Sequence, residues 1–173
     1  IKIRLSFDLQ EQSDILQIKG FNNQNMLTSI IRNNRNPNSV NFAWNLIENS
    51  LNDKLFSDLL FQQDSDDVYF IHLAFSFAKR EVLELIYSKL SQNHVKNDIQ
   101  QFLFFRNDFK NVLVYASQNE IDESVFPWIW RVFESVFDET LMNYNDFIYM
   151  TFAVGTPSSV KFIWNEIVAK KFS

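Results

Sequence analysis

The sequence predicts an all-α protein in which helices form a repeat solenoid. Three observations predict this fold: an octet with a helical pattern of apolar positions occurs four times, a second apolar element precedes each octet, and the 173 residues include only two glycines. Tight hairpins and glycine-rich loops depend on glycine, because it adopts backbone angles that other residues avoid. The composition therefore favours helices.

The octets align without gaps and begin at residues 40, 83, 126 and 160. Positions one, three, four, five and eight are apolar in every copy, whereas positions two and six are polar or proline. Positions one, four, five and eight have the spacing of one helix face, and position three widens that face. Position five is always a large aromatic residue, which we expect to lie in the core: Trp44, Tyr87, Trp130 and Trp164.

A shorter apolar element precedes each octet and predicts an inner helix paired with the outer helix of the octet. Its four copies are residues 27–30, 71–74, 113–116 and 150–153. Polar turns rich in Asn and Asp, which suit turn geometry, are expected upstream at 21–24, 64–67, 107–110 and 145–147. Short additional helices are expected at 14–18, 55–61, 99–105 and 139–142. Pro37 and Pro157 each precede an octet by three residues and mark the loop that leads into it.

The octets start 43, 43 and 34 residues apart. A period of 20 to 50 residues is typical of stacked repeats. We therefore expect a single array over residues 1–173, with residues 1–13 forming the end of a preceding element. The expected repeats are 14–54, 55–98, 99–138 and 139–173.

Composition excludes several classes of protein. The net charge is −5 and the 16 basic residues are scattered, which disfavours a nucleic-acid partner. The longest apolar run, 68–78, is far shorter than the ~20 residues of a membrane span. The chain has no cysteine, so disulfides and cysteine-ligated zinc are excluded. We expect an intracellular protein, cytoplasmic or nuclear, without a membrane partner.

The second repeat resembles the ankyrin family. Residues 70–74, Phe-Ile-His-Leu-Ala, stand where that family has Pro-Leu-His-x-Ala, and residues 79–86 resemble its inter-helix loop and outer helix. The turn glycine of the family is replaced by Asp67 in repeat two and by Phe109 in repeat three. The resemblance covers roughly 14–173 and implies a degenerate ankyrin array with long repeats. An array of HEAT-like or TPR-like helical hairpins remains an alternative.

No motif of catalytic chemistry is found. His72 and His94 are the only histidines, and the resemblance implies that His72 bonds neighbouring turns. Residues 64–67 resemble the start of a calcium loop but lack the later Gly and Glu that such loops need, so they predict a solvated turn. We therefore expect no enzyme, no metal, no cofactor and no small-molecule substrate. A helical enzyme or ligand-binding domain, which would need a deep polar pocket, is a remote alternative.

The resemblance implies a non-catalytic scaffold that binds a protein partner through turn tips and the inner-helix face, of which a regulator or inhibitor of that partner is one form. The acidic turns favour a basic partner surface. The turn aromatics either anchor the partner or pack back on a neighbouring repeat. An architectural segment of a larger HEAT-like or TPR-like protein is the alternative function. The expected contact residues are Asp66, Asp67, Phe77, Asp108, Phe109, Gln118, Asp146 and Phe147.

Overall fold

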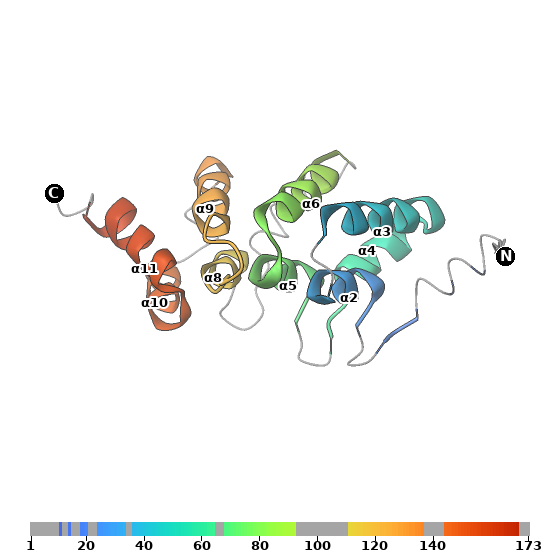
Figure 1. Ribbon diagram of the computed structural model, residues 1–173, viewed down its shortest axis with the longest axis horizontal. Helices are drawn as coiled ribbons and strands as arrows, with labels where there is room; N and C mark the ends of the chain where they lie inside the picture. The colour runs from blue at the N-terminus through green and yellow to red at the C-terminus, as the bar shows by residue number, and fades with distance from the viewer. Residues whose placement is uncertain are drawn as a thin grey trace. The chain divides into compact units, whose positions relative to one another are not determined.

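The computed structural model describes residues 11, 14, 18–20, 24–33, 36–64, 68–92, 111–136 and 144–169. Within these ranges the regular secondary structure is helical, which confirms the all-α prediction (Figure 1). The one β-type pairing among these residues is an isolated antiparallel bridge between Gln63 and Tyr69. Contacts divide the chain into two compact units, Ile1–Phe70 and Ile71–Ser173. None of the described helices is long and apolar enough to cross a membrane.

The helices occur where the sequence predicts them, as inner and outer helices in alternation. The inner helices are α2 (Met26–Asn33), α5 (Phe70–Phe77), α8 (Val112–Ser117) and α10 (Tyr144–Val154). The outer helices, which contain the octets, are α3 (Pro37–Ser50), α6 (Arg80–Gln92), α9 (Val125–Val136) and α11 (Pro157–Ile163). The last of these continues into the π-helical segment η2 (Trp164–Val168), and α4 (Asp53–Leu60) matches the additional helix expected at 55–61.

The starts of α3 and α11 follow from their sequences. Asn36 accepts a hydrogen bond from the backbone N–H of Asn38, and the hydroxyl of Thr156 accepts one from the N–H of Ser159. Pro37 and Pro157 come directly after these caps and are the first helical residues, rather than loop residues as expected. Proline suits this position because its missing N–H would have no partner within the helix.

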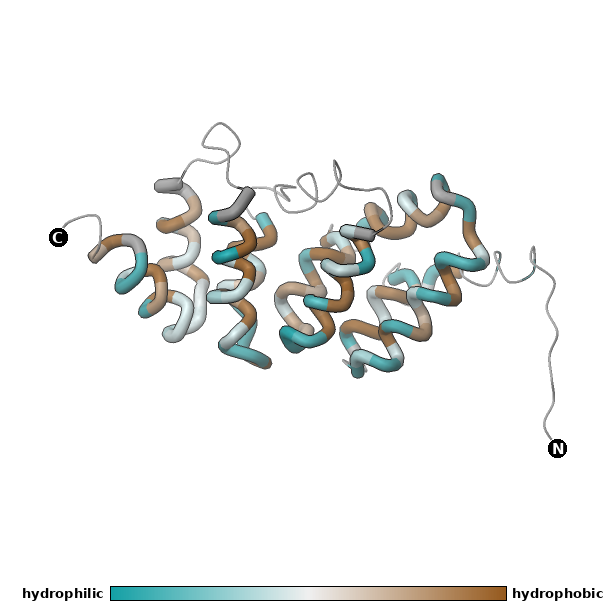
Figure 2. Tube along the Cα trace, turned by 90° about the horizontal axis from the view of Figure 1, so that it is seen from above, coloured by the Kyte–Doolittle hydropathy of each residue, from teal (hydrophilic) through white to brown (hydrophobic). Residues whose placement is uncertain are grey.

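The octet pattern corresponds to buried faces, and the hydropathy colouring places brown and teal on alternate sides along the helices (Figure 2). Position four is buried in every copy, at Ala43, Ile86, Ile129 and Ile163. At position five, Trp44 and Trp130 are buried and Tyr87 is half-buried. The prediction that every position-five aromatic lies in the core is wrong for Trp164, whose side chain is 55% exposed.

In the second unit, helices of one kind pack beside the next of that kind (Figure 1). Between inner helices, the ring of His72 on α5 stacks on Tyr115 of α8, with centroids 4.4 Å apart. Between outer helices, Tyr87 of α6 meets Trp128 of α9 edge to face at 6.1 Å, and Phe126 of α9 meets Phe162 of α11 at 5.7 Å. Successive helix pairs in this unit therefore share one continuous apolar layer.

Two of the expected polar turns differ from the structure. Residues 145–147 lie inside α10, which begins at Tyr144. Asp64 is not solvated: it is buried and its carboxylate lies 2.7 Å from the guanidinium of Arg32. The other carboxylate oxygen of Asp64 accepts the backbone N–H of Val68 and so closes the turn. The turn at 107–110 and the helices at 99–105 and 139–142 lie outside the described residues, as do most of 14–18 and 21–24.

Trp44→Ala should lower the free energy of unfolding by roughly 3–5 kcal/mol, because the indole is buried and its removal leaves a cavity beside Phe56, whose ring lies 5.3 Å away. Chemical denaturation measures the change. Phe42→Ala is the control in the same helix, since Phe42 is largely exposed and should cost less than about 1 kcal/mol. Equal effects of the two substitutions would contradict the buried position of Trp44.

Gly155→Ala should destabilise the second unit by about 1–3 kcal/mol, because an added Cβ would lie 2.5 Å from the carbonyl oxygen of Thr151 and 3.3 Å from the hydroxyl of Ser117. Gly20→Ala is the matched control, since its Cβ would meet nothing closer than 3.5 Å. Thermal unfolding of both variants compares the two sites. A Gly155→Ala variant as stable as Gly20→Ala would disprove the close approach of α10 to α8.

Candidate functional site

The loop between α8 and α9, residues 118–124, lies against the corner between α5 and α6. The side chain of Asn119 is buried in this contact. Its amide nitrogen donates to the carbonyl oxygens of Phe75 (2.8 Å) and Ala78 (2.9 Å), at the end of α5. Its amide oxygen accepts the backbone N–H groups of Ile121 and Asp122. All the polar capacity of this amide is therefore used in fixing the loop to the preceding helix pair.

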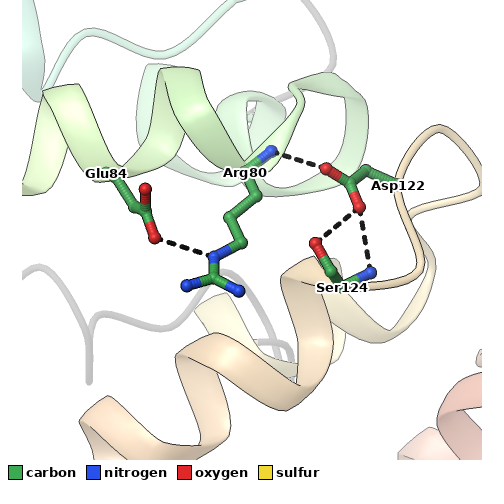
Figure 3. Close-up of polar contacts among 4 residues, drawn as sticks. All are labelled: Arg80, Glu84, Asp122 and Ser124. Atoms are coloured by element: carbon green, nitrogen blue, oxygen red, sulfur yellow. Dashed lines mark hydrogen bonds and ion pairs between the residues drawn. The ribbon is translucent and has the colours of Figure 1, made fainter.

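Asp122 makes a second tie three residues later (Figure 3). One carboxylate oxygen accepts the backbone N–H of Arg80 at 2.9 Å, and the other accepts the N–H and the hydroxyl of Ser124 at 3.0 and 2.7 Å. Arg80 is the first residue of α6, and Ser124 directly precedes α9. The first N–H groups of a helix have no partner within the helix. A single carboxylate thus satisfies backbone donors at the starts of two successive outer helices.

Opposing effects act on the pKa of Asp122. Partial burial raises it, but hydrogen bonds from the Ser124 hydroxyl and from the backbone of Arg80 and Ser124 lower it, as does the charge of Arg80. The net result is a pKa below the ordinary value of 3.8. The guanidinium of Arg80 itself bonds the carboxylate of Glu84 at 2.7 Å, one helical turn further along α6 (Figure 3). Asp122 is therefore held in its charged form.

Two apolar side chains are exposed on the elements that these ties join. Phe77, near the end of α5, is 40% exposed, and Ile121, in the loop, is 39% exposed. Gln118 is half-buried, and its backbone N–H bonds back into α8, whose end it caps. We define the corner surface as Phe77, Gln118 and Ile121. The sequence predicted Phe77 and Gln118 as contact residues but missed Ile121, a lone apolar residue in a polar loop.

The other expected contact residues do not join this surface. Phe147 is only 3% exposed, and its ring stacks on Phe126 and on Trp130 at 6.3 and 5.6 Å, so of the two alternatives it takes packing on a neighbouring repeat. Asp146 belongs to the first turn of α10 and not to a loop. The remaining four lie outside the described residues: Asp66, Asp67, Asp108 and Phe109.

The described residues include no group of three or more His, Cys, Asp or Glu side chains that could hold a metal ion. His72 is fully buried and stacked between the inner helices, which gives it a packing role. At the corner surface itself, the two strongest polar groups, Asn119 and Asp122, are occupied by backbone bonds. What this arrangement offers chemically is a fixed apolar contact area.

No protein-family model matches the chain, and neither the curated proteins nor the solved structures include a match to it.

Asp122→Asn should lower the free energy of unfolding by about 1 kcal/mol at pH 7, since a charged helix cap becomes neutral. The folded-state pKa is depressed, so the contribution of Asp122 is complete above the unfolded pKa of about 3.8 and is lost as the pH falls through the lower folded value. Urea unfolding at several pH values should show wild type and variant converging below about pH 4. Glu123→Gln, at the exposed neighbouring carboxylate, is the control. A difference that does not change with pH would rule out this account.

Proposed function

We propose that this protein is a non-catalytic interaction module, built of ankyrin-like helix pairs, that binds a partner protein through the corner surface. The observation that carries the proposal is the exposure of Phe77 and Ile121 on elements fixed by buried hydrogen bonds. Aromatic and aliphatic side chains exposed on a rigid support are typical anchors of protein interfaces. The succession of inner and outer helices supports the ankyrin-like part of the proposal.

Rigidity matters because association costs the entropy of every group that becomes ordered. The loop that carries Ile121 is already ordered by the four hydrogen bonds of Asn119 and the three of Asp122. Little conformational freedom is left to lose on binding. The surface is therefore suited to a partner that docks without remodelling it.

The charge around Ile121 indicates the chemistry of the partner. Glu120 and Glu123 flank it in the same loop and are exposed. An apolar anchor rimmed by carboxylates favours a partner that offers an apolar pocket with basic residues around it, since complementary charge accelerates encounter and fixes orientation. The net charge of −5 acts in the same direction.

Affinity purification of the intact protein from its native cells should recover a partner that a Phe77→Ala/Ile121→Ala double variant recovers at least tenfold less efficiently, corresponding to the loss of one or two anchors. Glu134→Gln, an exposed change on α9 outside the corner surface, is the matched control and should recover the partner like wild type. Association with the purified partner should also slow as salt is raised. Equal recovery by the double variant would exclude the corner surface as the binding site.

A further inference from the structure

Positions three and five of the octet face opposite sides of an outer helix, because residues two apart in an α-helix are separated by about 200°. In α9 both positions are covered. Trp128, at position three, packs on Phe75 and Tyr87 of the preceding helix pair, at 6.3 and 6.1 Å. Trp130, at position five, stacks on Phe147 of the following helix pair. Position three therefore faces backward along the chain and position five faces forward.

The other outer helices follow the same rule. Phe162, at position three of α11, packs backward on Phe126. Tyr87, at position five of α6, packs forward on Trp128. In the first unit, Trp44 at position five of α3 packs on Phe56 of α4, the next helix in the chain. An aromatic at either position thus meets another aromatic ring wherever a neighbouring helix is present.

Two aromatic residues break this rule, one on each side. Phe42, at the backward position of α3, is 70% exposed, and Trp164, at the forward position of the last octet, is 55% exposed. The two helices share seven of eleven residues, in the pattern Pro-x-Ser-Val-x-Phe-x-Trp-Asn-x-Ile over 37–47 and 157–167. Nearly the same helix is therefore used twice with opposite sides uncovered. What each copy lacks is the side on which the other is open.

We propose that the protein associates with a second copy of itself head to tail, with Trp164 of one molecule packing against Phe42 of the next. The precedent is the junction between Tyr87 and Trp128 inside the chain, where a forward position-five ring meets a backward position-three ring edge to face. The proposal extends this junction from one molecule to the next. It does not depend on the partner proposed for the corner surface.

The charge of the two sides suits contact between identical chains. Glu48 is the only charged residue of α3, and Phe42 is surrounded on its helix by Asn38, Ser39 and Asn45. A net charge of −5 therefore does not concentrate on the face that would meet Trp164. Beside Trp164, Lys161 and Glu166 have opposite signs. Repulsion between like charges is small at this contact, so it should depend little on salt.

The contact is heterologous, because different surfaces of the two molecules meet. Each added molecule brings a new free end, so wild-type protein should form dimers and then longer species as its concentration rises. The exposed aromatic area is smaller than that of standard stable interfaces, so we expect a dissociation constant in roughly the micromolar to millimolar range.

Sedimentation equilibrium over a concentration series tests the proposal with Phe42→Asp and Trp164→Asp. Each variant alone should be monomeric, with association at least tenfold weaker than wild type. A mixture of the two should form a one-to-one dimer and stop there, because one variant retains a working forward side and the other a working backward side. Circular dichroism melting verifies that both variants are folded. Ile121→Asp, on the corner surface, should associate like wild type.

Three results would overturn the proposal. Wild type that remains monomeric up to about 1 mM, the weak end of the expected range, has no such interface. A mixture of the two variants that remains monomeric excludes complementary ends. Loss of association in Trp164→Asp with none in Phe42→Asp indicates a symmetric dimer through Trp164 instead.

Discussion

The structure depends on satisfying the ends of short helices. The described α-helices have 6 to 14 residues, and the first N–H and last C=O groups of each have no partner within the helix. In α8, which has six residues, these end groups are most of the backbone. Side chains of asparagine supply much of what is missing, which gives a structural use to a residue that occurs 19 times in the chain. Those with printed capping or tying bonds are Asn25, Asn36, Asn52, Asn111 and Asn119.

The outer helices could be predicted from the sequence because their apolar spacing belongs to one helix and needs no knowledge of its neighbours. Exposure could not be predicted in the same way. Trp44 and Trp164 occupy the same place in nearly the same octet, yet one is buried and the other is mainly exposed. The difference lies in which helix follows each of them, and a local pattern carries no such information. The solenoid and the ankyrin resemblance concern the arrangement of pairs, so they remain proposals.

The candidate site was predicted only in part. Phe77 and Gln118 were expected from their place at the ends of inner helices, whereas Asn119, Ile121 and Asp122 lie in a loop whose polarity gave no sign of its burial or its bonds. The opposite error occurred at Phe147. Asn145 and Asp146 suggested a turn, but polar and acidic residues also suit the first turn of a helix, where α10 places them. Composition alone does not separate the two situations.

The ties between helix pairs in the second unit have a regular reach along the chain. Asn119 bonds carbonyls 44 and 41 residues before it, and Asp122 bonds an N–H group 42 residues before it. All three distances are close to the 43-residue interval between octets in that region. Duplicating or deleting one whole interval in the gene would keep donors opposite acceptors, whereas inserting two or three residues in the loop would misplace all of them. Evolution of this chain is therefore expected to change its length in whole helix pairs.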